Sequence, residues 1–306
     1  MLEWIRTIVM SLANQGILPE AFRYEFMINA LLCALFIGPI LGAVGTMVVT
    51  KKMAFFSEAV GHAAMTGIAI GILLGEPMQA PYISLFAYCI LFGLFINYTK
   101  NRTKMASDTL IGVFLSFSIA LGGSLLIVVA GKVNAHILEN ILFGSVLTVN
   151  DLDIYILIFS SLVLALVITP YFNRMLLASF NPSLASVRGV NVKLIDYVFI
   201  VIVTIITIAS VKIVGSILVE ALLLIPAASA KNLARSMKSF VLYSVLFSTI
   251  SCIVGIIFPI QLQLSIPSGG AIISVAGSIF FISIFIRMLF KKCLEGESIR
   301  KRVYYS

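Results

Sequence analysis

The sequence predicts an all-α protein that crosses a membrane many times. Of its 306 residues, 60% are hydrophobic and 11% are charged, whereas soluble proteins carry about 25% charged residues. The apolar residues fall in long runs, and a membrane-spanning helix needs roughly 20 of them in succession. The chain length therefore leaves room for a bundle of eight or nine spans and none for a separate soluble catalytic domain.

The apolar runs can be followed in order along the chain. They lie at residues 26–50, 54–75, 79–99, 108–130, 151–172, 195–214, 215–230, 239–258 and 268–290. The seventh run is short, begins at Gly215 and contains Pro226, so we expect a broken or partial span packed inside the bundle. We therefore expect residues 1–306 to form a single polytopic transmembrane domain of eight or nine spans.

The first 25 residues precede these runs and lack the basic start, apolar stretch and small-residue cleavage site of a signal peptide. We expect residues 1–25 to form an amphipathic segment lying in the membrane interface, with Trp4 as an anchor.

The distribution of Lys and Arg predicts the orientation of the chain in the membrane. Seventeen of the 21 basic residues fall in alternate connections, at Arg287 near the end of the last run, or in the tail at residues 291–306. Because basic residues favour the cytoplasmic side, the C-terminus and its basic tail are expected in the cytoplasm, with the N-terminus outside on a count of nine spans. The net charge of +8 thus indicates topology and not a nucleic-acid partner.

The chain lacks the motifs of a nucleotide-binding protein or a hydrolase. It has no GxxxxGK[ST] loop, GxSxG, HExxH or CxxC motif. We therefore expect a transport subunit without enzymatic activity, for which any ATP hydrolysis takes place in a partner subunit.

The segment SEAVGHAAMTGIAIG at residues 57–71 contains the most informative ionisable pair. Glu58 and His62 are four residues apart, so they lie on one face of a helix, among Ala, Gly and Thr. Ionisable residues inside a span are costly and often mark a path for ions or substrates. A carboxylate beside an imidazole suits Mn, Zn or Fe better than Na or K. The alternative is a Glu–His hydrogen bond that only packs helices.

Glu220 is a second candidate, since it lies in the middle of an apolar run. Such a carboxylate must meet a partner, water or a cation, or be protonated. It is equally compatible with a structural hydrogen bond and with a place on the transport path.

Four other carboxylates fall near the beginnings of apolar runs, where they complement the helix dipole. These are Asp108, Asp151, Asp153 and Asp196. We expect a capping role for them.

Residues 173–194 form the connection that we expect to contact a cytoplasmic partner. Within it, Asn181 is suited to cap a helix, Pro182 to the first helical position, and Gly189 to a left-handed helix end. The alternative is an ordinary capped loop helix with no partner.

The connection on the opposite side, residues 131–150, has apolar residues at helical spacing beside polar ones, among them His136. It is too short to span, so we expect an interfacial helix at the outer mouth, or alternatively a gate or docking surface.

Taken in order, these segments resemble the metal-chelate permeases of bacterial ABC importers, which move manganese, zinc or iron. The resemblance extends from about residue 26 to 290 and rests on five stretches. They are SEAVGHAAMTGIAIG, ILFGSVLTVNDLD, NPSLASVRGV, IVGSILVEALLLIPAASA and PSGGAIISVAGSIFF.

The resemblance implies the type II ABC importer fold, in a multi-pass protein of the bacterial cytoplasmic membrane. It implies a second permease copy, two cytoplasmic ATPase subunits and an extracytoplasmic metal-binding protein. It also implies that the divalent metal ion is the transported substrate and that no cofactor is permanently bound.

Residue by residue, the resemblance assigns Glu58 and His62 to the metal path, and we group Glu220 with them. It assigns contact with the ATPase to the stretch containing Asn181, Pro182, Ala185, Arg188 and Gly189. The sequence departs from the family pattern in having Glu58 and Asn181 where Asp is commoner, and Glu220 where a small polar residue is frequent.

The sequence is also compatible with three other functions. A permease for haem, siderophore or cobalamin would share the fold class but have a wide cavity. A proton-coupled secondary metal carrier would need no ATPase, and in a structural membrane protein neither Glu58 nor His62 would matter for uptake. The choice among Mn, Zn and Fe is also open.

Overall fold

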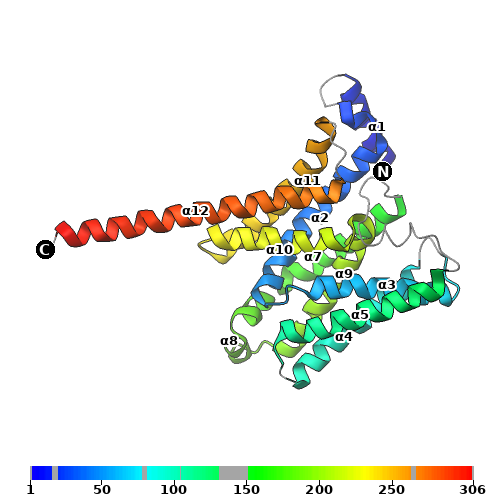
Figure 1. The fold of residues 1–306 in the computed structure, drawn as a ribbon, viewed down its shortest axis with the longest axis horizontal. Coiled ribbons are helices and arrows are strands. Elements are labelled where there is room, and N and C mark those ends of the chain that lie inside the picture. The colour runs from blue at the N-terminus through cyan, green and yellow to red at the C-terminus, as the bar shows by residue number, and fades with distance from the viewer. Residues whose placement is uncertain are drawn as a thin grey trace.

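The protein is a bundle of long helices (Figure 1). The computed structural model describes residues 2–15, 20–77, 81–103, 105–130, 151–262 and 267–304, without the side chains of 20, 21, 130, 164, 212 and 290–304. In chain order the helices are α1 (Leu2–Asn14), the 3₁₀ helix η1 (Glu20–Arg23), α2 (Glu25–Thr50), α3 (Phe56–Leu73), α4 (Tyr82–Thr103), α5 (Ser107–Ala130), α7 (Asp151–Phe180), α8 (Pro182–Val187), α9 (Val192–Val214), α10 (Ser216–Leu233), α11 (Met237–Gln261) and α12 (Ser268–Tyr304). These ranges contain no β-strand, so the predicted all-α class is confirmed.

Nine helices in the described ranges are long and apolar enough to cross a membrane. They are α2 to α5, α7 and α9 to α12, and each overlaps one of the apolar runs in the sequence. The chain is therefore a multi-pass membrane protein, and α10, which corresponds to the seventh run, is long and apolar enough to be one of the spans.

The break expected within the seventh run lies in front of it. Gly215 separates α9 from α10 with a backbone φ of +86°, a conformation that glycine adopts without the steric cost met by other residues. After this residue α10 is a continuous helix of 18 residues, even though it contains Pro226. The expectation of a break inside this run was wrong, because the interruption lies at Gly215 between α9 and α10, and α10 itself is continuous.

The spans differ in how deeply they are buried. Of the most apolar part of α3, 72% is buried inside the protein, against 17% for α12. The helix α10 packs against α2, α3, α9, α11 and α12. The interior is therefore built around α2, α3, α9 and α10, while α5 and α12 lie at the periphery.

Glycines allow the inner helices to approach one another closely. A Cβ atom at Gly45 of α2 would lie 2.1 Å from the carbonyl oxygen of Leu223 in α10. Any side chain at this position would therefore force the two helices to move apart. A Cβ atom at Gly42 would lie 2.7 Å from the carbonyl oxygen of Ser244 in α11. Ser244 Oγ in turn donates a hydrogen bond of 2.6 Å to the carbonyl oxygen of Gly42.

The helix α7 is longer than the run that predicts it. It continues to Phe180, so the expected connection at residues 173–194 contains the last turns of α7, the short helix α8 and the beginning of α9. Asn173, which follows the apolar run at 151–172, lies within α7. The helix ends before Asn181, which precedes a proline and is disfavoured from helical geometry for that reason.

The helix α1 is attached to the bundle by a buried arginine. Arg6 is 8% exposed, donates a hydrogen bond of 2.9 Å to Asn29 of α2, and forms an ion pair with Asp151 at the start of α7. The hydrogen bond that the Arg6 guanidinium donates to the Asp151 carboxylate raises the pKa of Arg6. Trp4 is 70% exposed, and the interfacial position of residues 1–25 stays a prediction.

Three of the four expected carboxylates lie in the first turn of a helix, namely Asp108 in α5 and Asp151 and Asp153 in α7. The expectation for Asp196 was wrong. Helix α9 begins at Val192 and is capped by Asn191, so Asp196 lies beyond its first turn and forms an ion pair with Lys51 instead.

The last helix, α12, projects beyond the bundle at its C-terminal end (Figure 1). Its apolar part ends at Leu289, and the backbone continues as helix to Tyr304. The basic tail predicted at 291–306 is therefore the continuation of α12 up to that residue. The expected amphipathic connection at 131–150, with His136, lies outside the described residues.

Candidate functional site

The first turns of α3 position the candidate pair Glu58 and His62. The helix is fixed on one side by Phe56, Ala59 and Ala63, which are fully buried. Glu58 and His62 lie one turn apart and are half-buried. Both side chains therefore lie inside the bundle without being sealed in its core.

Helix α10 contacts α3 at this level. A Cβ atom at Gly61 would lie 2.9 Å from Cβ of Ser216, so the two helices touch where α10 begins. Glu220 lies one turn after Ser216 and is half-buried. The glycine thus allows α10 to approach the part of α3 that carries Glu58 and His62.

The three candidate residues of the metal path form one electrostatic group. Glu58 is close enough to His62 for its charge to act on the imidazole. It is also close enough to Glu220 for the two carboxylates to interact. The structure therefore brings together Glu58, His62 and Glu220 from two helices that are separate in the sequence.

Within the described residues, the candidate donors do not form a closed metal site. In the part of the chain that the structure describes, no group of three or more His, Cys, Asp and Glu side chains is placed to hold a metal ion. Glu58, His62 and Glu220 are neighbours, but their ligand atoms do not converge on one point. The chemistry of the donor set, two carboxylates and an imidazole, suits a divalent transition metal.

The short helix α8 has the boundaries that the sequence predicts. Asn181 Oδ1 accepts a hydrogen bond of 3.0 Å from the Leu184 amide, and Pro182 is the first helical residue. At the other end Gly189 has φ of +75°, and the amide of Val190 donates a hydrogen bond of 3.0 Å to the carbonyl oxygen of Ala185. This is the hydrogen-bonding pattern of a glycine-ended helix.

One residue fixes α8 to the bundle and the others point outward. Ala185 is fully buried and belongs to the main apolar core, whereas Val187 is 84% exposed. Arg188 is also exposed. The helix therefore presents an apolar and basic surface while it is anchored through Ala185.

Two basic hollows lie at the end of α7, and they share Phe180 and Met237 as lining residues. One, of about 540 Å³, is lined by Arg174 and Arg188 among others. The other, of about 440 Å³, is lined by Lys231 and Arg235, from the end of α10 and the connection to α11. The connection between α10 and α11 thus extends the surface around α8, which the sequence analysis did not anticipate.

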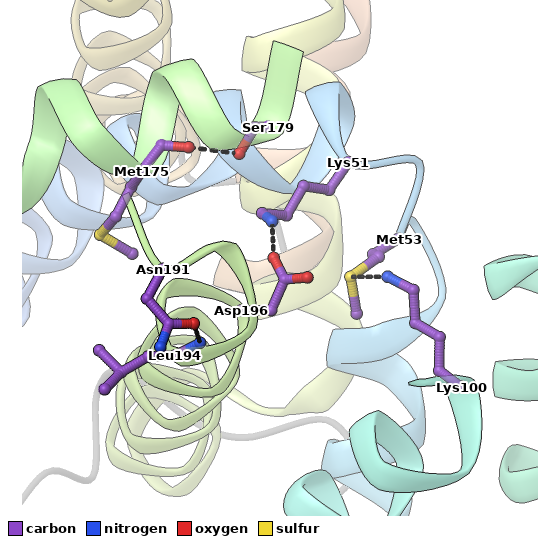
Figure 2. Close-up of polar contacts among 8 residues, drawn as sticks. All are labelled: Lys51, Met53, Lys100, Met175, Ser179, Asn191, Leu194 and Asp196. Carbon is purple, nitrogen blue, oxygen red and sulfur yellow. Dashed lines mark hydrogen bonds and ion pairs between the residues drawn. The ribbon is translucent and has the colours of Figure 1, made fainter. Parts of the chain in front are cut away.

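Sequence reasoning also missed a charged pair at this end of the bundle. Lys51 follows α2 and forms an ion pair with Asp196 of α9, although 145 positions separate them (Figure 2). Lys51 counts in the sequence only as one of the basic residues of a connection. No pattern of spacing signals a pair that is made by tertiary packing.

Comparison with known proteins agrees with this architecture. Residues 23–287 match the model of the ABC 3 transport family. The chain is 34% identical to the manganese import system permease protein ScaB of Streptococcus gordonii, over 86% of this chain and 92% of that protein. It is 31% identical to the high-affinity zinc uptake system membrane protein ZnuB of Haemophilus influenzae, over 86% of this chain and 98% of that one.

A solved structure has the same fold. PsaBC from Streptococcus pneumoniae, in complex with a Fab, superposes with a TM-score of 0.74 at 31% identity, over 86% of this chain and 92% of that chain. The helical bundle described above is accordingly the type II importer-like permease fold. With nearly the whole transmembrane part of the chain matched by the family model, the protein belongs to the ABC 3 transport family.

Proposed function

We propose that this chain is the permease subunit of an ATP-driven importer of a divalent transition metal ion, Mn, Zn or Fe, in a bacterial cytoplasmic membrane. The observation that carries the proposal is the contact between α3 and α10, which groups Glu58, His62 and Glu220 inside a membrane bundle. The printed functions of the relatives, manganese import and zinc uptake, support the same class of substrate.

The donor types support a transition metal over an alkali cation. Carboxylate oxygen and imidazole nitrogen together suit Mn, Zn and Fe, and they bind less tightly than a thiolate set that would retain the ion. Ionisable groups inside a membrane span are costly to maintain and are usually retained for a transport path. Glu58, His62 and Glu220 therefore act as transient ligands of an ion in passage.

The complete transport site requires a second copy of the chain. In the described part of one chain the donors do not form a closed site. Two copies related by a two-fold axis would double the carboxylates and imidazoles available to one ion. The ion is bound when the two sets are close, and it is released when they separate.

The ATPase subunits act on this chain at the end of the bundle that carries α8. This chain is a transport subunit, and ATP hydrolysis belongs to separate cytoplasmic ATPase subunits. Their contact surface on this chain comprises α8, with Asn181, Pro182, Ala185, Arg188 and Gly189, and the basic hollows beside it. The C-terminus lies on the same, cytoplasmic side, and an extracytoplasmic metal-binding protein delivers the ion to the opposite face. Alternating access follows from ATP-driven movement of the two copies.

The test is transport by the reconstituted complex. Vesicles containing this chain, its ATPase and its binding protein are supplied with Mn, Zn or Fe ions and, separately, with haem, a ferric siderophore or cobalamin. The proposal predicts ATP-dependent uptake of at least one of the three ions and no effect of a protonophore. Uptake of only the larger compounds would identify a different permease, and uptake without ATP that a protonophore abolishes would identify a secondary carrier.

A further inference from the structure

A partly buried group of charged residues, Lys51, Lys100 and Asp196, joins α4 and α9 to the residue that follows α2 (Figure 2). Lys51, the residue that follows α2, forms an ion pair with Asp196 of α9. The Lys51 side chain is 7% exposed and the Asp196 side chain 20% exposed, so the pair is largely removed from solvent. In such a setting the loss of one partner is costly, because it leaves an uncompensated charge.

A second lysine lies near this ion pair. Lys100, near the end of α4, is half-buried, and its charge interacts with both Asp196 and Lys51. Its Nζ also approaches Sδ of Met53 at 4.0 Å. Asp196 therefore has a remaining cationic neighbour if Lys51 is replaced, which makes Lys51 the better position for a test.

Helix α9 holds Lys51 by a second contact. The Nζ atom of Lys51 lies 5.1 Å from the centre of the Phe199 ring. Phe199 is buried and lies one turn after Asp196, on the same face of α9. Lys51 is thus fixed by a carboxylate and an aromatic ring from one helix.

The chain between Lys51 and Glu58 is short and closely hydrogen-bonded. The amide of Met53 donates a hydrogen bond of 3.1 Å to the carbonyl oxygen of Val48, and the amide of Phe56 donates one of 3.1 Å to the carbonyl oxygen of Met53. Helix α3 begins at Phe56, which is fully buried, and Glu58 lies in its first turn. A short, hydrogen-bonded connection therefore joins Lys51 to the first turn of α3, which contains Glu58.

A short segment also connects Asp196, the other partner of the ion pair, to α8. The amide of Val190 is hydrogen-bonded to Ala185 of α8, and the side chain of Asn191 caps α9 by accepting a hydrogen bond of 3.2 Å from Leu194 (Figure 2). Asp196 lies in the next turn of α9. Helix α8 and Asp196 thus belong to one continuous, hydrogen-bonded segment.

We propose that Lys51 and Asp196 are positioning residues for transport, which transmit the movement of α8 to the metal-path residues at the start of α3. The ion pair stays closed through the cycle and makes the start of α9 and the connection between α2 and α3 move as one body. This inference rests on the proposed function, in which α8 receives the movement of the ATPase. It adds the route by which that movement reaches Glu58 and His62.

The test compares three variants of the reconstituted complex. Lys51→Met removes the charge but retains an unbranched apolar side chain beside Phe199, and Asp196 retains Lys100. Lys51→Arg keeps the charge and is the conservative variant. Lys52→Gln removes a neighbouring charge that is exposed, so it is the matched control.

Two quantities are measured at equal amounts of inserted complex. The first is the number of metal ions taken up per ATP hydrolysed, which should fall about tenfold in Lys51→Met, within the range found for residues that couple two sites. Basal ATP hydrolysis should be retained in that variant, and Lys51→Arg and Lys52→Gln should stay within about twofold of wild type. A merely structural role would lower the amount of complex without changing this ratio.

The second quantity needs no knowledge of the cargo. Amide hydrogen exchange in residues 51–60 is compared with and without ATP, using an ATPase subunit that binds ATP without hydrolysing it. We expect ATP to change the exchange in wild type and in Lys52→Gln, and to have no effect in Lys51→Met. The same ATP response in Lys51→Met as in wild type would overturn the inference, whatever the complex transports. Absence of metal uptake by wild type, with the exchange response intact, would overturn only the proposed function.

Discussion

Gly61 of α3 and Ser216 of α10 are in direct contact, since a Cβ atom at Gly61 would lie 2.9 Å from Cβ of Ser216. Ser216 is buried at the beginning of α10, so it cannot move away from a larger side chain at position 61 as the end of a long, flexible side chain could. This contact brings the part of α3 that carries Glu58 close to the part of α10 that carries Glu220.

A leucine at Gly61 should push α3 away from α10 and separate the candidate ligands. We expect Gly61→Leu to lower metal uptake about tenfold, on the scale of changes that misorient metal ligands. Uptake in vesicles, divided by the amount of inserted protein, measures this. Gly112→Leu is the control, because a Cβ atom there meets nothing within 4 Å. An equal fall in uptake for Gly61→Leu and Gly112→Leu would show that the contact between Gly61 and Ser216 does not position the candidate ligands.

Glu220 should face the transport path and not merely pack α10. If so, Glu220→Gln keeps the size of the side chain, removes its charge, and lowers uptake more than it lowers the amount of folded protein. Glu25→Gln, at the exposed start of α2, should change neither quantity. A parallel fall in uptake and in folded protein for Glu220→Gln would favour a structural hydrogen bond.

Helix α8 should be needed for coupling and not for insertion. Ser186→Pro introduces a residue that cannot donate a backbone hydrogen bond inside a helix and clashes with the preceding turn. We expect ATP hydrolysis that is no longer linked to uptake, with normal amounts of complex in the membrane. Ser186→Ala keeps the helix and should behave as wild type, while normal uptake by Ser186→Pro would exclude the coupling role.

The spans and α8 could be predicted because their signals are local. Apolar runs determine which segments cross the membrane, and Asn181, Pro182 and Gly189 determine where α8 begins and ends through neighbouring backbone groups. The spacing of Glu58 and His62 also follows from helical periodicity alone. Each of these features depends on residues within a few positions of one another.

The rest depends on contacts between distant parts of the chain. Lys51 and Asp196 are 145 positions apart, and so are Arg6 and Asp151. Neither pair has a pattern that distinguishes it from other charged residues in connections. The proximity of Glu220 to Glu58 likewise requires the contact at Gly61, which only the packing of α10 on α3 reveals.

The attachment of α1 should contribute to stability. Arg6→Ala removes the hydrogen bond to Asn29, for which the expected cost is about 1 kcal/mol. Asp151→Asn should cost less, since the Asp151 side chain is 54% exposed and such pairs contribute little. Thermal unfolding of the purified protein in detergent shows which of the two variants has the lower melting temperature. A lower melting temperature for Asp151→Asn than for Arg6→Ala would contradict the account of this attachment.

The central claim is that Glu58 and His62 bind the transported ion, and metal uptake in vesicles tests it most directly. Wild type, Glu58→Ala, His62→Ala and Glu58→Asp are reconstituted with the ATPase and the binding protein, and uptake is divided by the amount of inserted complex. Both alanine variants should assemble and lose uptake, whereas Glu58→Asp should keep part of it because a carboxylate remains. Wild-type rates for both alanine variants would contradict the claim and leave the pair with a role in helix packing alone.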